Sequence, residues 1–274
     1  MTPLDILQAL GLVALGSGVA LFASMVGLGG GFILTPILIL VFRLPAQNAI
    51  AISLMAILGT TISASFAYIR QGRVDYTLAV LYDILDVPGV ILGAYLTTIL
   101  PSSQLAAVVG LLIVALSILL LTKNHGSSPA SKPGDKPGWE RRKIDASGKA
   151  FKYRIARVEL ALLSSFLSGF ITGFCGLGGG VTDTTTMILL GVPPHIAAAS
   201  SEFAMALTNL IGVIAHGLLN NIRVEYALPL TAGTVVGAQV GSFLARRVRG
   251  EIIQDILALT ALLMGLRLLF LSFV

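Results

Sequence analysis

The sequence predicts an all-α, polytopic helical membrane protein built from two homologous halves. Of its 274 residues, 55% are hydrophobic and only 11% are charged, whereas a soluble domain carries about 25% charged residues. Apolar runs of about twenty residues, long enough to cross a bilayer, follow one another along most of the chain. The motif Gly-Leu-Gly-Gly-Gly occurs once in each half. Together these observations argue against a soluble fold.

Five apolar elements make up the first half. The first lacks a positively charged leader, so we expect it to remain as a helix rather than to be cleaved as a signal. The second is too short to span: about twelve helical residues rise about 18 Å, against a hydrocarbon core of about 30 Å. With the preceding glycines it should form a broken or re-entrant helix. The expected elements are residues 4–26, 32–42, 46–69, 76–100 and 104–122.

A polar segment separates the halves at residues 123–154. Ten of the eighteen basic residues lie between Lys123 and Arg157, and positive charge concentrates in cytoplasmic loops. We therefore interpret this segment as a basic cytoplasmic linker rather than a nucleic-acid-binding patch. Residues 1–122 form the first transmembrane repeat and residues 155–274 the second.

The second half repeats the first at an offset of 149 residues. This offset superposes the glycine motifs at 27–31 and 176–180, and it pairs Pro45 with Pro194 and Ala49 with Ala198. Matched motifs in one order indicate an internal duplication. The expected elements are residues 155–175, 181–191, 195–217, 225–246 and 252–273.

Lysine and arginine positions set the expected orientation. The uncharged turn at 101–103 should lie outside, and Arg70 and Arg73 inside. If the first two elements of each half form a return pair, the halves are inverted, both chain ends lie outside and the arginine cluster at 246–249 lies inside. If those elements make a net crossing, the repeats are parallel. We expect the inverted arrangement.

The glycine motifs are the first candidate site. In inverted-repeat transporters, broken helices meet near the bilayer midplane, and their N-termini attract anions. Glycine permits the left-handed turn and lets a ligand approach the amides. The alternative is that the glycines only allow close helix packing. The predicted substrate-binding residues here are Gly29, Gly30, Gly31, Gly178, Gly179 and Gly180.

Polar residues at membrane depth form a second candidate group, because burying them in a bilayer is costly. Glu202, Asn209 and His216 recur every seven residues and so share one helix face. Ser53 and Thr60 are the counterparts of Glu202 and Asn209. We expect Ser53, Thr60 and Asn209 to contact substrate, and Glu202 and His216 to carry protons. Alternatively, His216 is a solvated or interfacial residue near the helix end.

Further acids are expected to act in coupling or gating. Asp83 and Asp86 lie three residues apart on one helix face, and Asp183 follows the second glycine motif. Pairing of Asp83 and Asp86 with Arg70 or Arg73 is the alternative. The single cysteine, Cys175, is expected to be a small packing residue, and we expect no metal site and no cofactor.

Several of these stretches resemble the TauE/SafE sulfite exporters. The resemblance rests on GLGGGFILTPIL, GLGGGVTD, VPPHIAAASSEF, IAHG and GRVDY, and it extends over nearly the whole chain outside the linker. It implies a small permease for sulfite, organosulfonates or related anions. Where the family usually has a Thr-Ser pair, this chain has Ile52-Ser53 and Ser201-Glu202.

The sequence thus favours a secondary transporter of a small sulfur-containing oxyanion that works by alternating access and is coupled to protons. It is expected in the inner cell membrane, and a homodimer is left open. A passive anion channel is the main alternative. A membrane enzyme using His216, Glu202, Asp183 and the aspartate pair is a second, although no HExxH or Gly-x-Ser-x-Gly motif occurs.

Overall fold

The computed structural model describes residues 5–122, 139–146, 148–155, 157–245 and 250–273. Within these residues the chain forms ten helices and one two-stranded sheet. Eight of these helices are long and apolar enough to cross a membrane. The predicted class of a polytopic helical membrane protein is therefore confirmed. The arginine cluster at 246–249 and residues 123–138 of the predicted linker lie outside the described residues.

The helices of the first half begin and end at residues that favour such boundaries. The Asp5 amide donates to the Gln8 side chain (3.4 Å) at the start of α1. α1 ends at Gly27, which is left-handed (φ +76°), and α2 has only ten residues, or about 15 Å of rise. The helices are α1 (Ile6–Val26), α2 (Gly31–Leu40), α3 (Ala46–Arg70), α4 (Tyr76–Leu96) and α5 (Ser102–Thr122).

The second half has the same succession of long and short helices. α6 ends at Gly176, which is also left-handed (φ +65°), and α7 again has ten residues. Pro194 opens α8, where its missing N–H is not needed. The helices are α6 (Val158–Cys175), α7 (Gly180–Leu189), α8 (Pro194–Leu218), α9 (Val224–Leu244) and α10 (Gly250–Phe273).

The two halves exchange helices rather than lying beside each other. α1 packs along α9, α4 packs along α6, and α5 packs along α10. The α1–α9 and α4–α6 pairs use glycines spaced four apart, which let backbones approach closely. A β-carbon at Gly237 would collide with the carbonyl oxygen of Ser17 on α1, and one at Gly93 with that of Phe170 on α6. The exchange therefore depends on residues that have no side chain.

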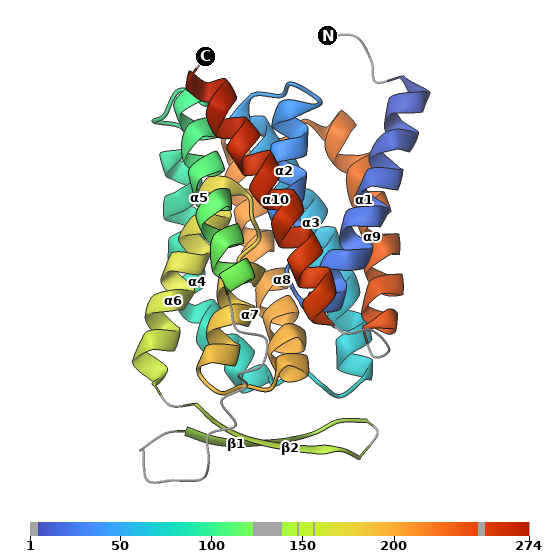
Figure 1. Cartoon of the computed structure of the whole chain (residues 1–274), viewed down its shortest axis with the longest axis vertical. Coiled ribbons are helices and arrows are strands. Elements are labelled where there is room, and N and C mark those ends of the chain that lie inside the picture. Colours follow the sequence, from blue (N-terminus) through green and yellow to red (C-terminus); the bar gives the residue numbers. More distant parts are fainter. Residues whose placement is uncertain (1–4, 123–138, 147, 156, 246–249, 274) are drawn as a thin grey trace.

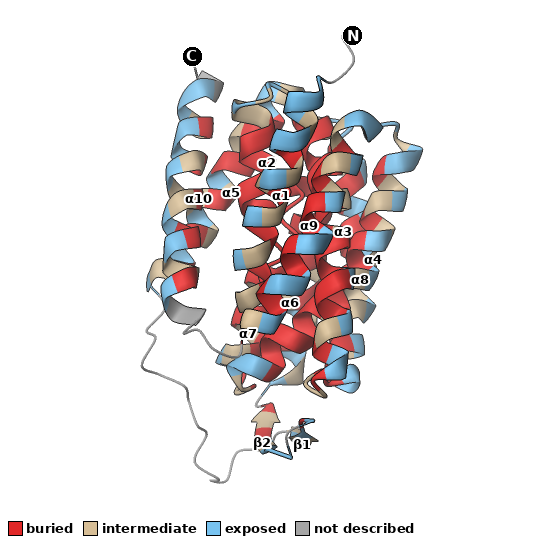
Figure 2. Ribbon diagram, turned by 90° about the vertical axis from the view of Figure 1, so that its right-hand side faces the viewer, coloured by how far each residue is buried: buried red, intermediate tan, exposed pale blue. Residues whose placement is uncertain are grey.

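The helices run along one common direction, with both chain ends at one end of the bundle and the sheet at the other (Figure 1). Buried residues fill the middle, while exposed residues lie on outward faces (Figure 2). Many of the exposed residues are large and apolar, for example Leu163, Phe243 and Phe270. Such a surface suits contact with lipid.

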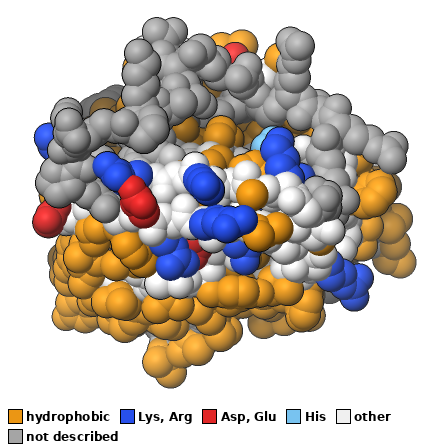
Figure 3. Space-filling view, turned by 90° about the horizontal axis from the view of Figure 1, so that it is seen from below, with side chains coloured by type: hydrophobic (Ala, Val, Ile, Leu, Met, Phe, Trp, Pro, Cys, Tyr) orange, Lys and Arg blue, Asp and Glu red, His pale blue; other side chains and the backbone are white. Residues whose placement is uncertain are grey.

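Part of the predicted linker folds into an antiparallel hairpin of β1 (Trp139–Ile144) and β2 (Ala150–Ile155), with Trp139 opposite Ile155. Tyr153 and Ile155 pack with Leu78 of α4 and with residues of α7 and α8. Lys and Arg side chains gather across this end of the molecule, and hydrophobic side chains surround them (Figure 3). The hairpin thus covers one end of the bundle.

An ionic contact fastens the hairpin to the start of α4. The Asp75 carboxylate accepts hydrogen bonds from Arg141 Nε (3.0 Å), Arg141 Nη2 (2.5 Å) and the Tyr153 hydroxyl (2.5 Å). It also caps α4 by accepting from the Leu78 amide (3.3 Å). Asp75 is only 2% exposed. One carboxylate therefore serves both as a helix cap and as the anchor of the hairpin.

Candidate functional site

The two glycine segments, residues 27–31 and 176–180, meet inside the bundle. The Thr35 hydroxyl of α2 donates to the Gly176 carbonyl (3.1 Å), and the Thr184 hydroxyl of α7 donates to the Gly27 carbonyl (2.9 Å). All four residues are buried. The starts of the two short helices are thereby tied to each other by a reciprocal pair of hydrogen bonds.

Close packing requires some of these glycines. A β-carbon at Gly31 would collide with the Gly176 carbonyl oxygen, and one at Gly180 would lie 2.7 Å from that of Gly27. Gly30 and Gly179 instead face helices of their own halves: their β-carbons would lie 3.0 Å from Val19 Cγ1 and 2.8 Å from Ser168 Oγ. Close packing therefore requires a residue without a β-carbon at Gly31 and Gly180.

Gly29 and Gly178 have a different setting. Both are left-handed, with φ of +70° and +80°, and the described residues offer their amides no backbone acceptor. The Ile57 side chain of α3 lies against both, with its Cγ2 atom 3.1 and 3.0 Å from the positions of their β-carbons. In this conformation an apolar side chain thus lies against both of these glycines.

The polar residues expected to contact substrate have different surroundings. The Ser53 hydroxyl donates to the Gly176 carbonyl (3.0 Å), so it reaches the second glycine segment. The Thr60 hydroxyl donates to Ala56 of its own helix (3.3 Å). Asn209 is fully buried, and its side-chain amide has no partner among the described residues. A buried amide with its full hydrogen-bonding capacity unused is costly, which keeps Asn209 a candidate for contact with a ligand.

Three of the predicted acids gather between α4, α6, α7 and α8. The Thr208 hydroxyl lies 2.7 Å from Asp83 Oδ1 and 3.3 Å from Asp86 Oδ2, and Asp183 is close enough to Asp86 for an electrostatic interaction. Asp86 and Asp183 are 1% and 0% exposed. Arg73 instead lies 4.0 Å from Asp145 of the hairpin turn, so Thr208 is the observed partner of the aspartates.

The Asp183 carboxylate has no hydrogen-bond partner among the described residues. The nearby Ser168 hydroxyl donates to the Gly179 carbonyl instead (3.2 Å). Since the Thr208 hydroxyl has one proton, it cannot fully satisfy two carboxylates either. The group therefore requires protons or a bound cation for neutrality.

His216 is held in one orientation by three elements. Its Nε2 atom lies 2.9 Å from the Gly173 carbonyl, which can only accept, so Nε2 carries the proton. Nδ1 then accepts a hydrogen bond from the side-chain amide of Asn221 (3.2 Å). The side-chain amide of Asn48 donates to the backbone carbonyl of Asn221 (2.7 Å). His216 is 0% exposed, so it is not a solvated residue.

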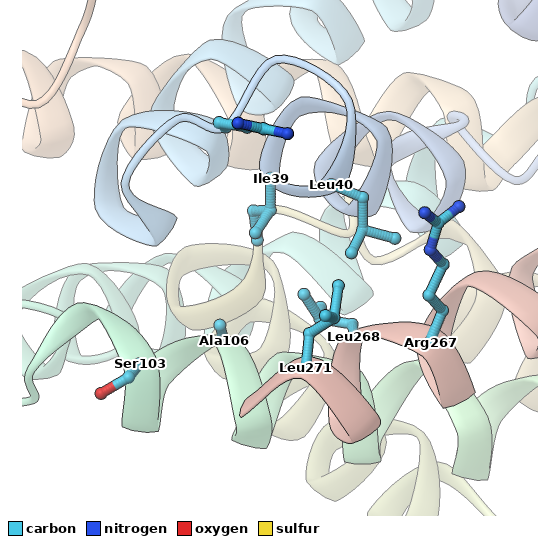
Figure 4. Close-up of a pocket in the computed structure, with 8 residues that line it drawn as sticks. Ile39, Leu40, Ser103, Ala106, Arg267, Leu268 and Leu271 are labelled. Atoms are coloured by element: carbon cyan, nitrogen blue, oxygen red, sulfur yellow. The ribbon is translucent and has the colours of Figure 1, made fainter. Parts of the chain in front are cut away.

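A cavity of about 460 Å³ lies at the end of the molecule that carries both termini. Figure 4 shows Leu268 and Leu271 reaching into it from α10 below α2, with Arg267 beside them. Arg43 and Ser103 complete its polar lining. None of the glycines at 27–31 or 176–180 lines it, so this cavity is separate from the place where the glycine segments meet.

The chain matches a protein family along most of its length. The family model described as sulfite exporter TauE/SafE matches residues 12–268. The chain belongs to this family. The match includes both glycine segments and every predicted site residue. This TauE/SafE protein is accordingly a membrane transporter and not an enzyme.

Individual relatives agree with this assignment. The probable membrane transporter protein YunE of Bacillus subtilis is 29% identical over 269 residues, covering 94% of this chain and 96% of the relative. The probable membrane transporter protein MJ0441 of Methanocaldococcus jannaschii is 22% identical over 94% of both chains. TauE/SafE family protein 3 of Arabidopsis thaliana is 31% identical over 39% of this chain and 23% of its own length. No solved structure matches the chain.

Some residues at the site were missed by the sequence analysis. The offset of 149 residues pairs Thr35 with Thr184, so the repeat itself contained the signal for the reciprocal threonines. Apolar and polar residues alternate from Phe151 to Ile155, directly after a turn that contains Gly148, which is typical of the second strand of a hairpin. Ile57 and Thr208 carry no such signal, because only the tertiary packing places them.

Proposed function

We propose that this TauE/SafE transporter moves a small sulfur-containing oxyanion, such as sulfite or an organosulfonate, and binds it where the two glycine segments meet. The observation that carries the proposal is the meeting of two buried ten-residue helices at their N-termini. Helix N-termini carry partial positive charge and unpaired amides, which together favour an anion. The amides of Gly29 and Gly178 donate to no backbone acceptor among the described residues.

The proposed mechanism is alternating access between two inverted repeats. The reciprocal exchange of α1 with α9 and α4 with α6 supports this, because each half contributes equivalent helices to both pairs. Both termini also lie opposite the hairpin (Figure 1). We place the hairpin on the cytoplasmic side of the inner membrane because basic residues concentrate there.

Proton coupling completes the proposal. We assign substrate contact to these residues: Gly29, Gly30, Gly31, Gly178, Gly179, Gly180, Ser53, Thr60 and Asn209. Coupling or gating is assigned to Asp83, Asp86, Asp183, Glu202 and His216. This assignment is supported by carboxyl groups that are buried at membrane depth without basic partners. A charged carboxylate is costly there, so such a group is expected to bind and release protons.

Reconstitution into liposomes tests this function. We expect uptake of labelled sulfite or methanesulfonate above that of protein-free vesicles, and accumulation beyond equilibrium when a pH gradient is imposed. Asp183→Asn should abolish the response to the gradient, whereas Glu159→Gln, a change at an exposed position, should preserve it. Uptake that only equilibrates the anion, whatever the gradient, would establish a passive channel. No uptake of either anion would refute the proposal.

A further inference from the structure

Glu202 lies beside the first glycine segment, and α8 holds it there. The position of a β-carbon at Gly27 is 2.8 Å from Ala198, and that at Gly29 is 3.7 Å from the Met205 sulfur. Ala198, Glu202 and Met205 are four and three residues apart, so they share one face of α8. The backbone of Gly29 faces the Glu202 carboxyl group. The segment is thus lined by a carboxyl group at the point where we expect the anion.

No group in the described residues neutralises this carboxyl. Glu202 is 0% exposed, and neither of its carboxyl oxygens has a hydrogen-bond partner of normal geometry. The Tyr68 hydroxyl of α3 is close enough to Glu202 for an electrostatic interaction. However, this hydroxyl donates its hydrogen bond to the Ser24 carbonyl (2.7 Å). The helices packed against α8 carry these further ionisable groups: Arg70 on α3, Tyr76, Tyr82, Asp83, Asp86 and Tyr95 on α4, Glu159 and Cys175 on α6, and Asp183 on α7.

The corresponding place in the other half is occupied by a different kind of side chain. The offset of 149 residues pairs Glu202 with Ser53, whose hydroxyl reaches the second glycine segment. A hydroxyl is neutral throughout the physiological range of pH, whereas a carboxyl group is not. Equivalent positions therefore give one glycine segment a constant neighbour and the other a neighbour that changes charge.

We propose that Glu202 is a built-in competitor for the anion and must be protonated before the first glycine segment can bind one. As a carboxylate it faces the amide that the anion requires and repels a second negative charge. As a carboxylic acid it no longer repels the anion and can donate a hydrogen bond to it. One proton then binds with each anion and leaves with it, so a monovalent anion moves without net charge.

This inference rests on the proposed function, and binding measurements on the purified full-length protein distinguish the two. Methanesulfonate and sulfate are suitable probes because neither changes charge between pH 5.5 and 8.5. We expect the Kd of the wild-type protein to rise by up to about tenfold per pH unit as the carboxyl loses its proton. Glu202→Gln should bind with a Kd that is independent of pH and close to the wild-type value at the acidic end.

Two further variants keep the test interpretable. Glu225→Gln changes an exposed acid at the start of α9 and should retain the wild-type pH dependence. Glu202→Ser copies the residue of the other half and should resemble Glu202→Gln, in case that variant folds poorly. A wild-type Kd that does not vary with pH overturns the inference, as does a Glu202→Gln variant that keeps the wild-type slope. Absence of binding of either probe by every protein at every pH counts against the proposed function instead.

Discussion

Removing the Arg141 side chain should release the hairpin from the bundle. Arg141 donates two hydrogen bonds to the buried Asp75 carboxylate. Removing one partner of a buried ion pair costs about 3–5 kcal/mol of stability. The Arg141 side chain is 25% exposed, and Tyr153 and the Leu78 amide still bond to Asp75 in the variant. We therefore expect Arg141→Ala to weaken docking by about 2–3 kcal/mol, a factor of about 30 to 150.

Amide hydrogen exchange of residues 139–155 measures this loss. An isolated two-stranded hairpin is only marginally stable, so undocking should expose its amides, and exchange should accelerate by that factor. Arg142→Ala is the matched control, because Arg142 is the next residue of β1 and is exposed on the opposite face. Equal exchange in Arg141→Ala and Arg142→Ala would refute the anchoring role of Asp75.

The same contact predicts an acid-dependent release of the hairpin. Burial alone would raise the pKa of Asp75, but the hydrogen bonds from Arg141, Tyr153 and the Leu78 amide outweigh burial and hold this pKa below its ordinary value. Because the pKa of Asp75 is lower in the docked state, its carboxylate stabilises docking at any pH above its ordinary pKa of about 3.9. This stabilisation is lost as the pH falls through the pKa of the docked state. Protection should thus be constant down to about pH 5 and fall below about pH 4, and Asp75→Asn should remove most of this dependence.

Two further predictions concern topology and packing. In intact cells, cysteines introduced at Ser102 and Asn220 should both react with an impermeant reagent from outside, and one at Gly250 only from inside. Labelling of Asn220 and Gly250 with the opposite sidedness would mean parallel repeats. Gly31→Ala should cost about 1–3 kcal/mol of stability, because its β-carbon meets the Gly176 carbonyl. Gly148→Ala, which has open space around it, should cost only the strain of its left-handed backbone, and equal melting temperatures would contradict this packing.

The sequence predicted the helices well because their signals are local. Each expected element lies within a few residues of an observed helix, and the short second element appears as α2 and α7. Glycines, prolines and uninterrupted apolar runs act within one or two turns, so they can be read without knowing the partner helix.

The exchange of helices between the halves could not be predicted in this way. Gly89, Gly93, Gly233 and Gly237 indicate close packing, but a glycine does not specify which helix it contacts. The gathering of Asp183 with Asp83 and Asp86 depends on the same exchange, because α4 and α7 are brought together through α6 and α8. The glycine segments were recognised as a pair from the repeat, whereas the insertion of Ile57 beside them followed from packing alone.

If an anion binds between the two glycine segments, its position in a ligand-bound structure is the most direct test. Selenite, a heavier analogue of sulfite, would be located by its anomalous scattering in crystals grown at acidic pH. We predict a peak within hydrogen-bond distance of the Gly29 and Gly178 amides, with the Ile57 side chain displaced. A single peak elsewhere, for example between Arg43 and Arg267 in the cavity beside α10, would contradict the account.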